Sequence, residues 1–357
     1  MTHELRKGYT TGTCAQAASK ASAIMLFEKK VIDEVSIVTP IGVPLRLPIV
    51  DQKVDEDFAR CAVIKDAGDE PDVTDKIKVY STVRVSEKPG ITIKGGEGIG
   101  IVTKAGLPIP KGEYAINPVP RMMIIKELSQ FLIMVKGLEV IISVPLGEEI
   151  AKRTFNPKLG IVGGISILGT TGFVEPRSVD AYKTSLVLQL DMVKASGHKK
   201  VALVLGYLGE RYCREVLGLS EEMIVRVGDH VGFMVGACKE KGFKEVILAG
   251  YLGKLVKIAK GQLNTHKSFG DLRIETIATY AESQGAKKET VERILNERSA
   301  QATVEIIEKA GLSDLFDMIA KDVVKALSSI TDSTLDIRCF VLSLEGRLLG
   351  LYPKGGL

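Results

Sequence analysis

Hydrophobic and polar positions follow two different patterns, one on each side of residues 155–157. Before this point, residues 35–47 and 62–93 are typical of β structure with turns, and VSIVTP and KIKVYSTVRV within them alternate apolar and polar residues, as half-exposed antiparallel strands do. After it, short apolar runs alternate with stretches of helical period, which favours a mostly parallel sheet with right-handed crossovers. The pattern predicts a two-domain α/β and α+β protein. We expect an antiparallel α+β domain over residues 1–155 and a mostly parallel, doubly wound α/β domain over residues 156–357, closing with helices and a hairpin that turns at Glu345-Gly346.

Glycines end the predicted strands of the C-terminal half. Three strands end at Gly206, Gly228 and Gly250, and an apolar run over residues 159–168 leads into Gly169-Thr170-Thr171-Gly172. The carboxyl ends of parallel strands share one sheet edge, where doubly wound sheets bind their ligands. A tight turn without a ligand explains the Gly169–Gly172 segment about equally well. No GxGxxG or GxxxxGK[ST] pattern accompanies it, so neither dinucleotide binding nor P-loop phosphate binding follows. The residues predicted to line a ligand site at this edge are Gly169, Thr170, Thr171, Gly172, Gly206 and Gly250.

Two stretches of the N-terminal half have unusual backbone chemistry. Thr10, Thr11 and Thr13 surround Gly12 at the start of an alanine-rich helix, where hydroxyls either cap the helix or help its free N–H groups to receive a carboxylate. The stretch 94–121 is rich in glycine and proline, which excludes regular helix over most of it. It is either a rigid structural loop or a binding loop. Its candidate binding groups are Lys104, Asn117 and Arg121.

Other polar clusters have plain alternatives. Five acids between Asp66 and Asp75 form a solvated loop by default, with a divalent cation site as the less favoured hypothesis. The lysines after Gly250 fit the wet face of an amphipathic helix. His266, between Thr265 and Lys267, is a candidate proton-transfer or anion-binding group.

Composition narrows the function class. The chain has 357 residues, and its formal net charge of +4 gives no case for nucleic-acid binding. The most apolar segment, residues 131–147, is too short and too interrupted by charge to span a bilayer, and the first residues lack the apolar core of a signal peptide. We therefore expect a cytoplasmic protein with no membrane partner. The five cysteines form no CxxC pair and the four histidines show no metal-ligand spacing, so we expect free thiols and no protein-bound metal.

Six uncommon motifs follow one another along the chain. They are GYTTGTCAQAASKA (8–21), IKDAGDEPDVT (64–74), GGEGIGIVTKAGL (95–107), AINPVPR (115–121), NPKLGIVGGISILGTTGFVEP (156–176) and GKLVKIAKG with TH (253–266). Taken in order, they make the sequence similar to the cobalt-precorrin-5B C(1)-methyltransferases of anaerobic cobalamin synthesis (CbiD). The resemblance is collinear from about Gly8 to Arg273 and departs from the family pattern at Ala105, Asp229-His230 and Tyr251, which leaves the roles of the loops after Gly228 and Gly250 open.

The resemblance implies methyl transfer from S-adenosylmethionine to C-1 of a cobalt-containing tetrapyrrole, giving cobalt-precorrin-6A. The methyl donor is then assigned to the predicted sheet edge. The tetrapyrrole carboxylates are assigned to Thr10, Thr11, Thr13, Lys104, Asn117 and Arg121, since arginine, lysine and hydroxyl groups bind carboxylates. Cobalt arrives inside the substrate. Two alternatives remain open: a nicotinamide-dependent tetrapyrrole reductase, against which no dinucleotide fingerprint with an acid about 20 residues on is seen, and a non-catalytic corrinoid-binding protein.

Overall fold

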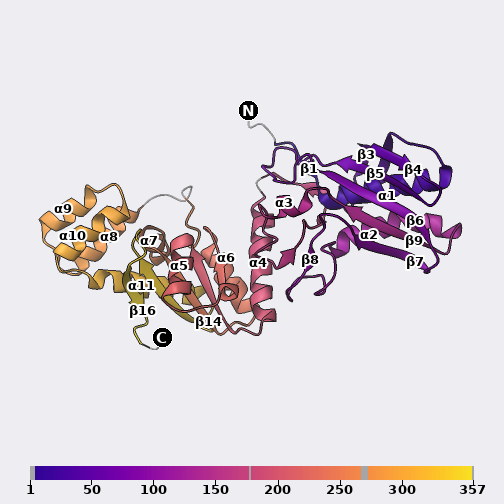
Figure 1. The fold of residues 1–357 in the computed structure, drawn as a ribbon. Coiled ribbons are helices and arrows are strands. Elements are labelled where there is room, and N and C mark those ends of the chain that lie inside the picture. The colour runs from indigo at the N-terminus through magenta and orange to yellow at the C-terminus, as the bar shows by residue number, and fades with distance from the viewer. Residues whose placement is uncertain (1–4, 177, 267–271, 356–357) are drawn as a thin grey trace. The chain divides into compact units, whose positions relative to one another are not determined.

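The computed structural model describes residues 5–176, 178–266 and 272–355. The chain divides into two units, Met1–Val179 and Asp180–Leu357, each with hydrophobic cores of its own. We call them the N-terminal unit and the C-terminal unit; they run from indigo to magenta and from magenta to yellow in Figure 1. No helix among the described residues is long and apolar enough to cross a membrane.

The N-terminal unit is built on a five-stranded sheet of order β4-β5-β6-β9-β7, in which only the β7–β9 pair is parallel. Its strands are β1 (Gly8–Tyr9), β2 (Glu34–Val38), β3 (Pro44–Pro48), β4 (Val50–Val54), β5 (Phe58–Ile64), β6 (Lys78–Ser86), β7 (Gly90–Gly95), β8 (Ile101–Val102), β9 (Gly137–Ser143), β10 (Ile161–Val162) and β11 (Phe173–Val174). Its helices are α1 (Thr11–Glu28), α2 (Pro118–Leu128), the 3-10 helix η1 (Ser129–Ile133) and α3 (Gly147–Ala151).

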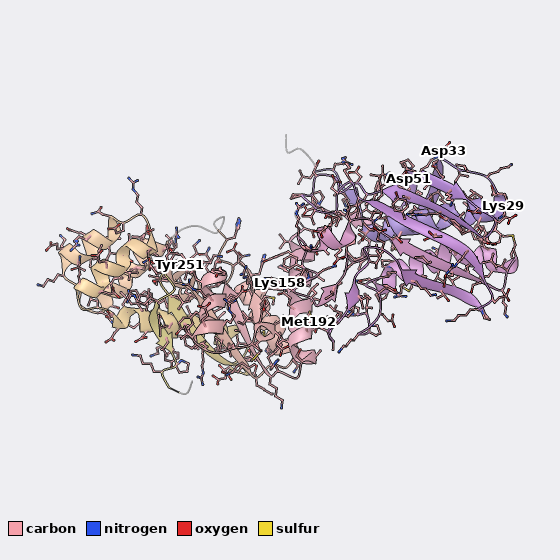
Figure 2. The ribbon with its side chains drawn as sticks, viewed as in Figure 1. Lys29, Asp33, Asp51, Lys158, Met192 and Tyr251 are labelled. Atoms are coloured by element: carbon pink, nitrogen blue, oxygen red, sulfur yellow. The ribbon has the colours of Figure 1, made fainter. Side chains whose placement is uncertain are left out.

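Helix α1 is the core element of this unit. Thr10 caps its first turn, and its alanines and small polar residues are buried against β5 and β6 on one side and α2 on another. Small side chains let the helix approach the sheet closely, which explains why so much of its surface is buried. The helix ends at Lys29 (labelled in Figure 2), which takes a left-handed conformation with a φ of 55°.

The C-terminal unit has one sheet of order β13-β12-β14-β15-β16, parallel except for the last strand. Its strands are β12 (Lys200–Leu205), β13 (Ile224–Arg226), β14 (Glu245–Tyr251), β15 (Asp336–Leu342) and β16 (Leu348–Tyr352). Its helices are α4 (Val179–Ala195), α5 (Tyr207–Glu215), the 3-10 helix η2 (Glu221–Met223), α6 (Val231–Glu240), α7 (Leu252–Ala259), α8 (Arg273–Ser283), α9 (Lys288–Leu295), α10 (Ala300–Lys309) and α11 (Asp314–Ile330).

Helices cover both faces of this sheet. One face packs against α4, α6, α7 and α11 in the larger core, whereas the other packs against α5 in a smaller core around Val204, Tyr212 and Phe340. Helices α8, α9 and α10, orange in Figure 1, pack against one another and against α7, and their buried residues belong to the larger core. The predicted C-terminal hairpin is present as β15 and β16.

The mixed α/β class predicted from the sequence is confirmed, with sheets of mixed orientation. One predicted strand was placed wrongly. The apolar run over residues 159–168 does not join the parallel sheet, because its strand β10 pairs antiparallel with β8 in the N-terminal unit. Likewise β11 pairs with β1. The units therefore divide after Val179, later than the boundary expected at residue 155.

Candidate functional site

The predicted ligand residues fall into separate units. Gly169–Gly172 belongs to the N-terminal unit, whereas Gly206 and Gly250 belong to the parallel sheet of the C-terminal unit. The prediction that they line one sheet edge is wrong, because no strand of the 159–174 segment pairs with that sheet. Each unit is therefore considered by itself.

The start of α1 is closed by the segment 166–172. The N–H of Gly12 donates to the carbonyl of Leu168 at 2.9 Å, and the N–H of Thr10 donates to the carbonyl of Gly172 at 3.1 Å. A carbonyl of the same chain thus meets the free end of the helix, where a substrate carboxylate was predicted. These hydrogen bonds hold together two of the family motifs, GYTTGTCAQ and GISILGTTGF.

The threonine hydroxyls take part in the same closure. Thr13 Oγ1 donates to the Gly172 carbonyl at 2.7 Å, so the Thr10 hydroxyl, 3.0 Å away, donates to Thr13 Oγ1. Thr11 Oγ1 accepts from the N–H of Leu168 at 2.9 Å. All three side chains are buried. These contacts favour a structural role for Thr10, Thr11 and Thr13 in place of the substrate-binding role predicted.

Glycines of the 166–172 segment serve packing. Gly169 has a φ of +134°, and a Cβ atom there would overlap with the Thr10 side chain. Gly172 has a φ of +90°, and a Cβ atom there would lie 3.0 Å from Thr39 Cβ. A larger residue at either position would disturb folding, so neither glycine needs a ligand to explain it.

Arg121 is held by its own unit. Its Nε donates to the Ile116 carbonyl at 2.8 Å, and its terminal nitrogens lie 3.4 Å from the carbonyls of Ile93 and Tyr114. A 3.3 Å ion pair joins it to Glu113. The guanidinium thus ties the start of α2 to β7 and to the preceding loop. The sequence had instead predicted that Arg121 binds a carboxylate of the substrate.

Other predicted groups of the N-terminal unit lie at its surface. Lys104 and Thr170 are exposed, and Asn117 is half-buried at the N-cap position of α2, where its side chain makes no capping hydrogen bond. These three side chains remain candidates for substrate contact.

The acidic loop is ordered by internal contacts. Asp66 forms a bidentate pair with Arg6 at 2.6 and 2.8 Å, and this pair together with the Gly68 N–H holds its pKa well below the usual range. Asp72 contacts Nζ of the buried Lys65 at 2.7 Å and also caps Thr74. Within the described ranges no group of three or more His, Cys, Asp or Glu side chains is arranged to hold a metal ion.

The C-terminal unit has a topological switch point. The chain leaves β12 through α5 on one face of the sheet and leaves β14 through α7 on the other, while β12 and β14 lie side by side. At such a point the loops after the two strands separate and open a crevice at the carboxyl edge, which is where open α/β sheets bind ligands. Tyr251, labelled in Figure 2, is the last residue of β14 on this edge.

The glycines at this edge have different tasks. Gly206 has a φ of +109°, and nothing lies within 4 Å of the position a Cβ atom would take. Gly209, in the first turn of α5, packs directly on the Ala249 carbonyl. Gly250 is buried within β14, opposite Leu205. Gly206 therefore makes the turn and leaves open space, whereas Gly209 and Gly250 permit close packing.

A polar cluster stands at the same edge. Asp229 Oδ1 accepts from Thr265 Oγ1 at 2.6 Å and pairs with Lys254 Nζ at 3.0 Å. Lys257, buried in α7, donates to the Thr265 carbonyl at 3.3 Å. His266 follows Thr265, and its N–H donates to Asn264 Oδ1. The structure thus brings the predicted residue His266 to the edge that carries Gly206.

Charges in this cluster influence one another. Partial burial by itself raises the pKa of Asp229, but the contacts from Thr265 and Lys254 outweigh burial and leave the pKa below its ordinary value. Burial, helped by Lys183, lowers the pKa of His230, whose ring lies 5.6 Å from that of Tyr182. At neutral pH the cluster therefore holds a carboxylate beside a neutral imidazole.

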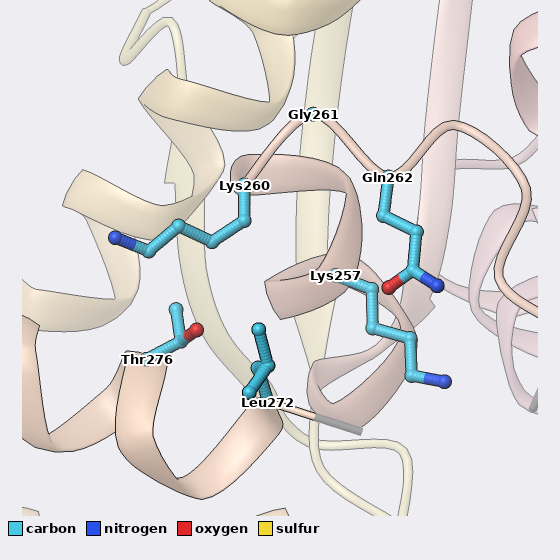
Figure 3. A pocket seen from close by; sticks show the side chains of 6 residues that line it. All are labelled: Lys257, Lys260, Gly261, Gln262, Leu272 and Thr276. Atoms are coloured by element: carbon cyan, nitrogen blue, oxygen red, sulfur yellow. The ribbon is translucent and has the colours of Figure 1, made fainter. Parts of the chain in front are cut away.

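A hollow of about 260 Å³ lies on the α7 side of this region. Figure 3 shows Lys257 and Lys260 pointing in different directions from α7, with Leu272 and Thr276 on the opposite wall. Lys260 Nζ lies 6.0 Å from the centroid of the Tyr280 ring. Two of the six residues that line the hollow are lysines, and Gly261 and Gln262 complete the lining.

Sequence reasoning did not single out Asp229 or Gly209 as residues of this edge, and it interpreted Lys254 as part of the wet face of a helix. The available signal was a glycine pair, Gly206-x-x-Gly209, after one apolar strand and an acid after the next. That signal gains meaning only once β13 is known to neighbour β12.

Comparisons with known proteins cover both units. The family model described as CbiD matches residues 1–176, and the model described as CbiD, C-terminal domain, matches residues 264–353. The cobalt-precorrin-5B C(1)-methyltransferase of Thermoanaerobacter sp. (strain X514) is 46% identical over 99% of this chain and 96% of its own length. That of Methanocaldococcus jannaschii is 41% identical over 99% of both chains. The crystal structure of the cobalamin biosynthesis protein (cbiD) from Archaeoglobus fulgidus is 32% identical, covers 79% of this chain and 85% of its own, and has a TM-score of 0.38.

Proposed function

Because this chain belongs to the CbiD family, we propose that it is a cobalt-precorrin-5B C(1)-methyltransferase that uses S-adenosylmethionine. It transfers a methyl group to C-1 of a cobalt-containing tetrapyrrole in cobalamin biosynthesis. The observation that carries this proposal is the 46% identity to a relative of that name over 99% of the chain, since it extends through both units. Cobalt belongs to the substrate.

The methyl donor is assigned to the carboxyl edge of the C-terminal sheet, between β12 and β14. Gly206 leaves open space there, and Gly209 lets α5 begin close to β14. The exposed ring of Tyr207, 56% accessible, offers a flat surface beside Gly206 that suits an adenine. The residues present therefore fit an adenosine-bearing ligand. Gly169–Gly172 is no longer included in this assignment.

The tetrapyrrole is assigned to the N-terminal unit. Its acetate and propionate groups need cations and amide or hydroxyl donors that the fold has not already used. Lys104, Asn117 and Thr170 meet that requirement better than the buried threonines or Arg121 do.

Bound S-adenosylmethionine would supply an already activated methyl group. The chain's own task is then to align the attacking carbon with that methyl group and to exclude water. His266 remains the candidate proton acceptor if the reaction releases a proton, since it lies in the polar cluster of the donor edge.

The test is a single-turnover incubation of the full-length protein with cobalt-precorrin-5B and S-adenosylmethionine carrying a ¹³C methyl group. We expect equal amounts of S-adenosylhomocysteine and of a tetrapyrrole with the label on C-1. Tight tetrapyrrole binding without any methyl transfer would instead support a corrinoid-binding protein. Consumption of NADPH without label transfer would support a reductase.

A further inference from the structure

Asp229 occupies a position that suits recognition of a ribose. It follows β13, and β13 neighbours β12, the strand on one side of the switch point. In open α/β sheets, an acid at the end of the neighbouring strand, roughly 20 residues after the glycine turn, accepts hydrogen bonds from ribose hydroxyls. Here the interval from Gly206 to Asp229 is 229 − 206 = 23 residues.

The glycines before it fit the same arrangement. A glycine-only turn at Gly206 and close packing of the following helix through Gly209 are two of the tasks that glycines have in nucleotide-binding βα turns. The sequence lacks the full GxGxxG pattern, so periodicity and motif alone did not indicate the site. The strand order supplies what the motif does not.

The carboxylate of Asp229 is held in place with one oxygen left over. Its contacts with Thr265 Oγ1 and Lys254 Nζ both use Oδ1, and Oδ2 makes no hydrogen bond or ion pair within the described part of the chain. Its side chain is 30% exposed. An oriented carboxylate with a free oxygen can accept a charge-assisted hydrogen bond from a hydroxyl.

The contacts of Asp229 place it beside the ends of the neighbouring strands. Lys254 follows β14 and Asp229 follows β13, and β12 lies between these two strands. Lys254 lies in the first turn of α7 and Asp229 comes shortly before α6, so the ion pair joins the starts of two helices that cover the same face of the sheet.

We propose that Asp229 is the ribose-recognising residue of the donor site, accepting through Oδ2 from the 2′- or 3′-hydroxyl of the bound adenosine. The inference rests on the proposed function for the identity of the donor. The shared chemistry is a ribose, which S-adenosylmethionine and nicotinamide dinucleotides both contain. A purely structural alternative is that Asp229 only fastens the 264–266 loop through Thr265.

The experiment is calorimetry on the full-length protein with S-adenosylhomocysteine and its 2′-deoxy and 3′-deoxy analogues. Wild type should bind the ribose form at least about tenfold more tightly than one of the deoxy forms. D229A should bind the ribose form as weakly as that deoxy form, which abolishes the ratio. The matched control is D191N, which removes the ion pair between Asp191 of α4 and Lys241 at the end of α6 and should leave the ratio unchanged.

A second variant separates recognition from folding. D229N retains Oδ1 for Thr265 but replaces Oδ2 with an amide nitrogen, so it should fold and lose most of the ratio even if D229A does not fold. Equal weakening of ribose and deoxy forms, with the ratio kept, would overturn the inference and assign Asp229 a fastening role. If NADH showed this ratio against its deoxy analogues and S-adenosylhomocysteine did not, the ribose role of Asp229 would stand but the proposed donor would be overturned. Absence of binding by wild type to either ligand would overturn both proposals.

Discussion

At the residue scale, Arg121 is the side chain whose interpretation changes most. Its guanidinium donates to backbone carbonyls of β7 and of the loop before α2. R121M should leave these carbonyls without their donor and lower the free energy of unfolding by about 1–3 kcal/mol in denaturant titrations. K104M, which removes an exposed cation, should leave stability within about 0.5 kcal/mol and raise the KM for the tetrapyrrole. A stable R121M protein with a raised KM for the tetrapyrrole would instead support the prediction that Arg121 binds a substrate carboxylate.

The cysteines give a second prediction at this scale. All five are free and buried, as expected of scattered thiols. Burial raises the pKa of Cys14 to about 12 and that of Cys61 to about 11. The reactive thiolate is therefore scarce at neutral pH. Ellman's reagent should label none of the cysteines in the native protein and all of them in guanidinium. Fast labelling of Cys14 in the native state would contradict the burial described here.

At the element scale, the start of α1 depends on a segment far along the chain. A Cβ atom at Gly169 would overlap with Thr10 and would also strain the backbone. G169A should therefore lower the free energy of unfolding by about 2–4 kcal/mol. G163A is the matched control, because Gly163 also has a positive φ but nothing lies within 4 Å of its Cβ position. It should cost only the backbone term, about 1–2 kcal/mol. Equal losses in both variants would show that the contact with Thr10 contributes nothing.

The elements also show how far the sequence could be read. The apolar runs that became β12 and β14 were predicted because short buried strands between helices have a distinctive pattern. The run that became β10 is also short and apolar but pairs with β8, about 60 residues earlier. Periodicity indicates which face of a strand is buried, but it does not indicate which other strand it pairs with. Gly206 was therefore predicted at the edge, whereas Asp229 needed the strand order to gain a role.

At the scale of the whole molecule, two units with separate cores divide the substrate and donor tasks in the proposed enzyme. Methyl-donor recognition is then assigned to the loops after β12, β13 and β14. The segment Gly169–Gly172, which the sequence had included in the donor site, is not part of this assignment. This division differs from the prediction made from the sequence pattern, which placed both groups of glycines at one edge.

Hydrogen exchange of the full-length protein with and without S-adenosylhomocysteine tests this division most directly. We expect slower exchange on ligand binding at residues 206–210, 228–232 and 251–255, with no change at residues 166–174. Protection of the 166–174 segment, with none at the three loops of the C-terminal unit, would contradict it.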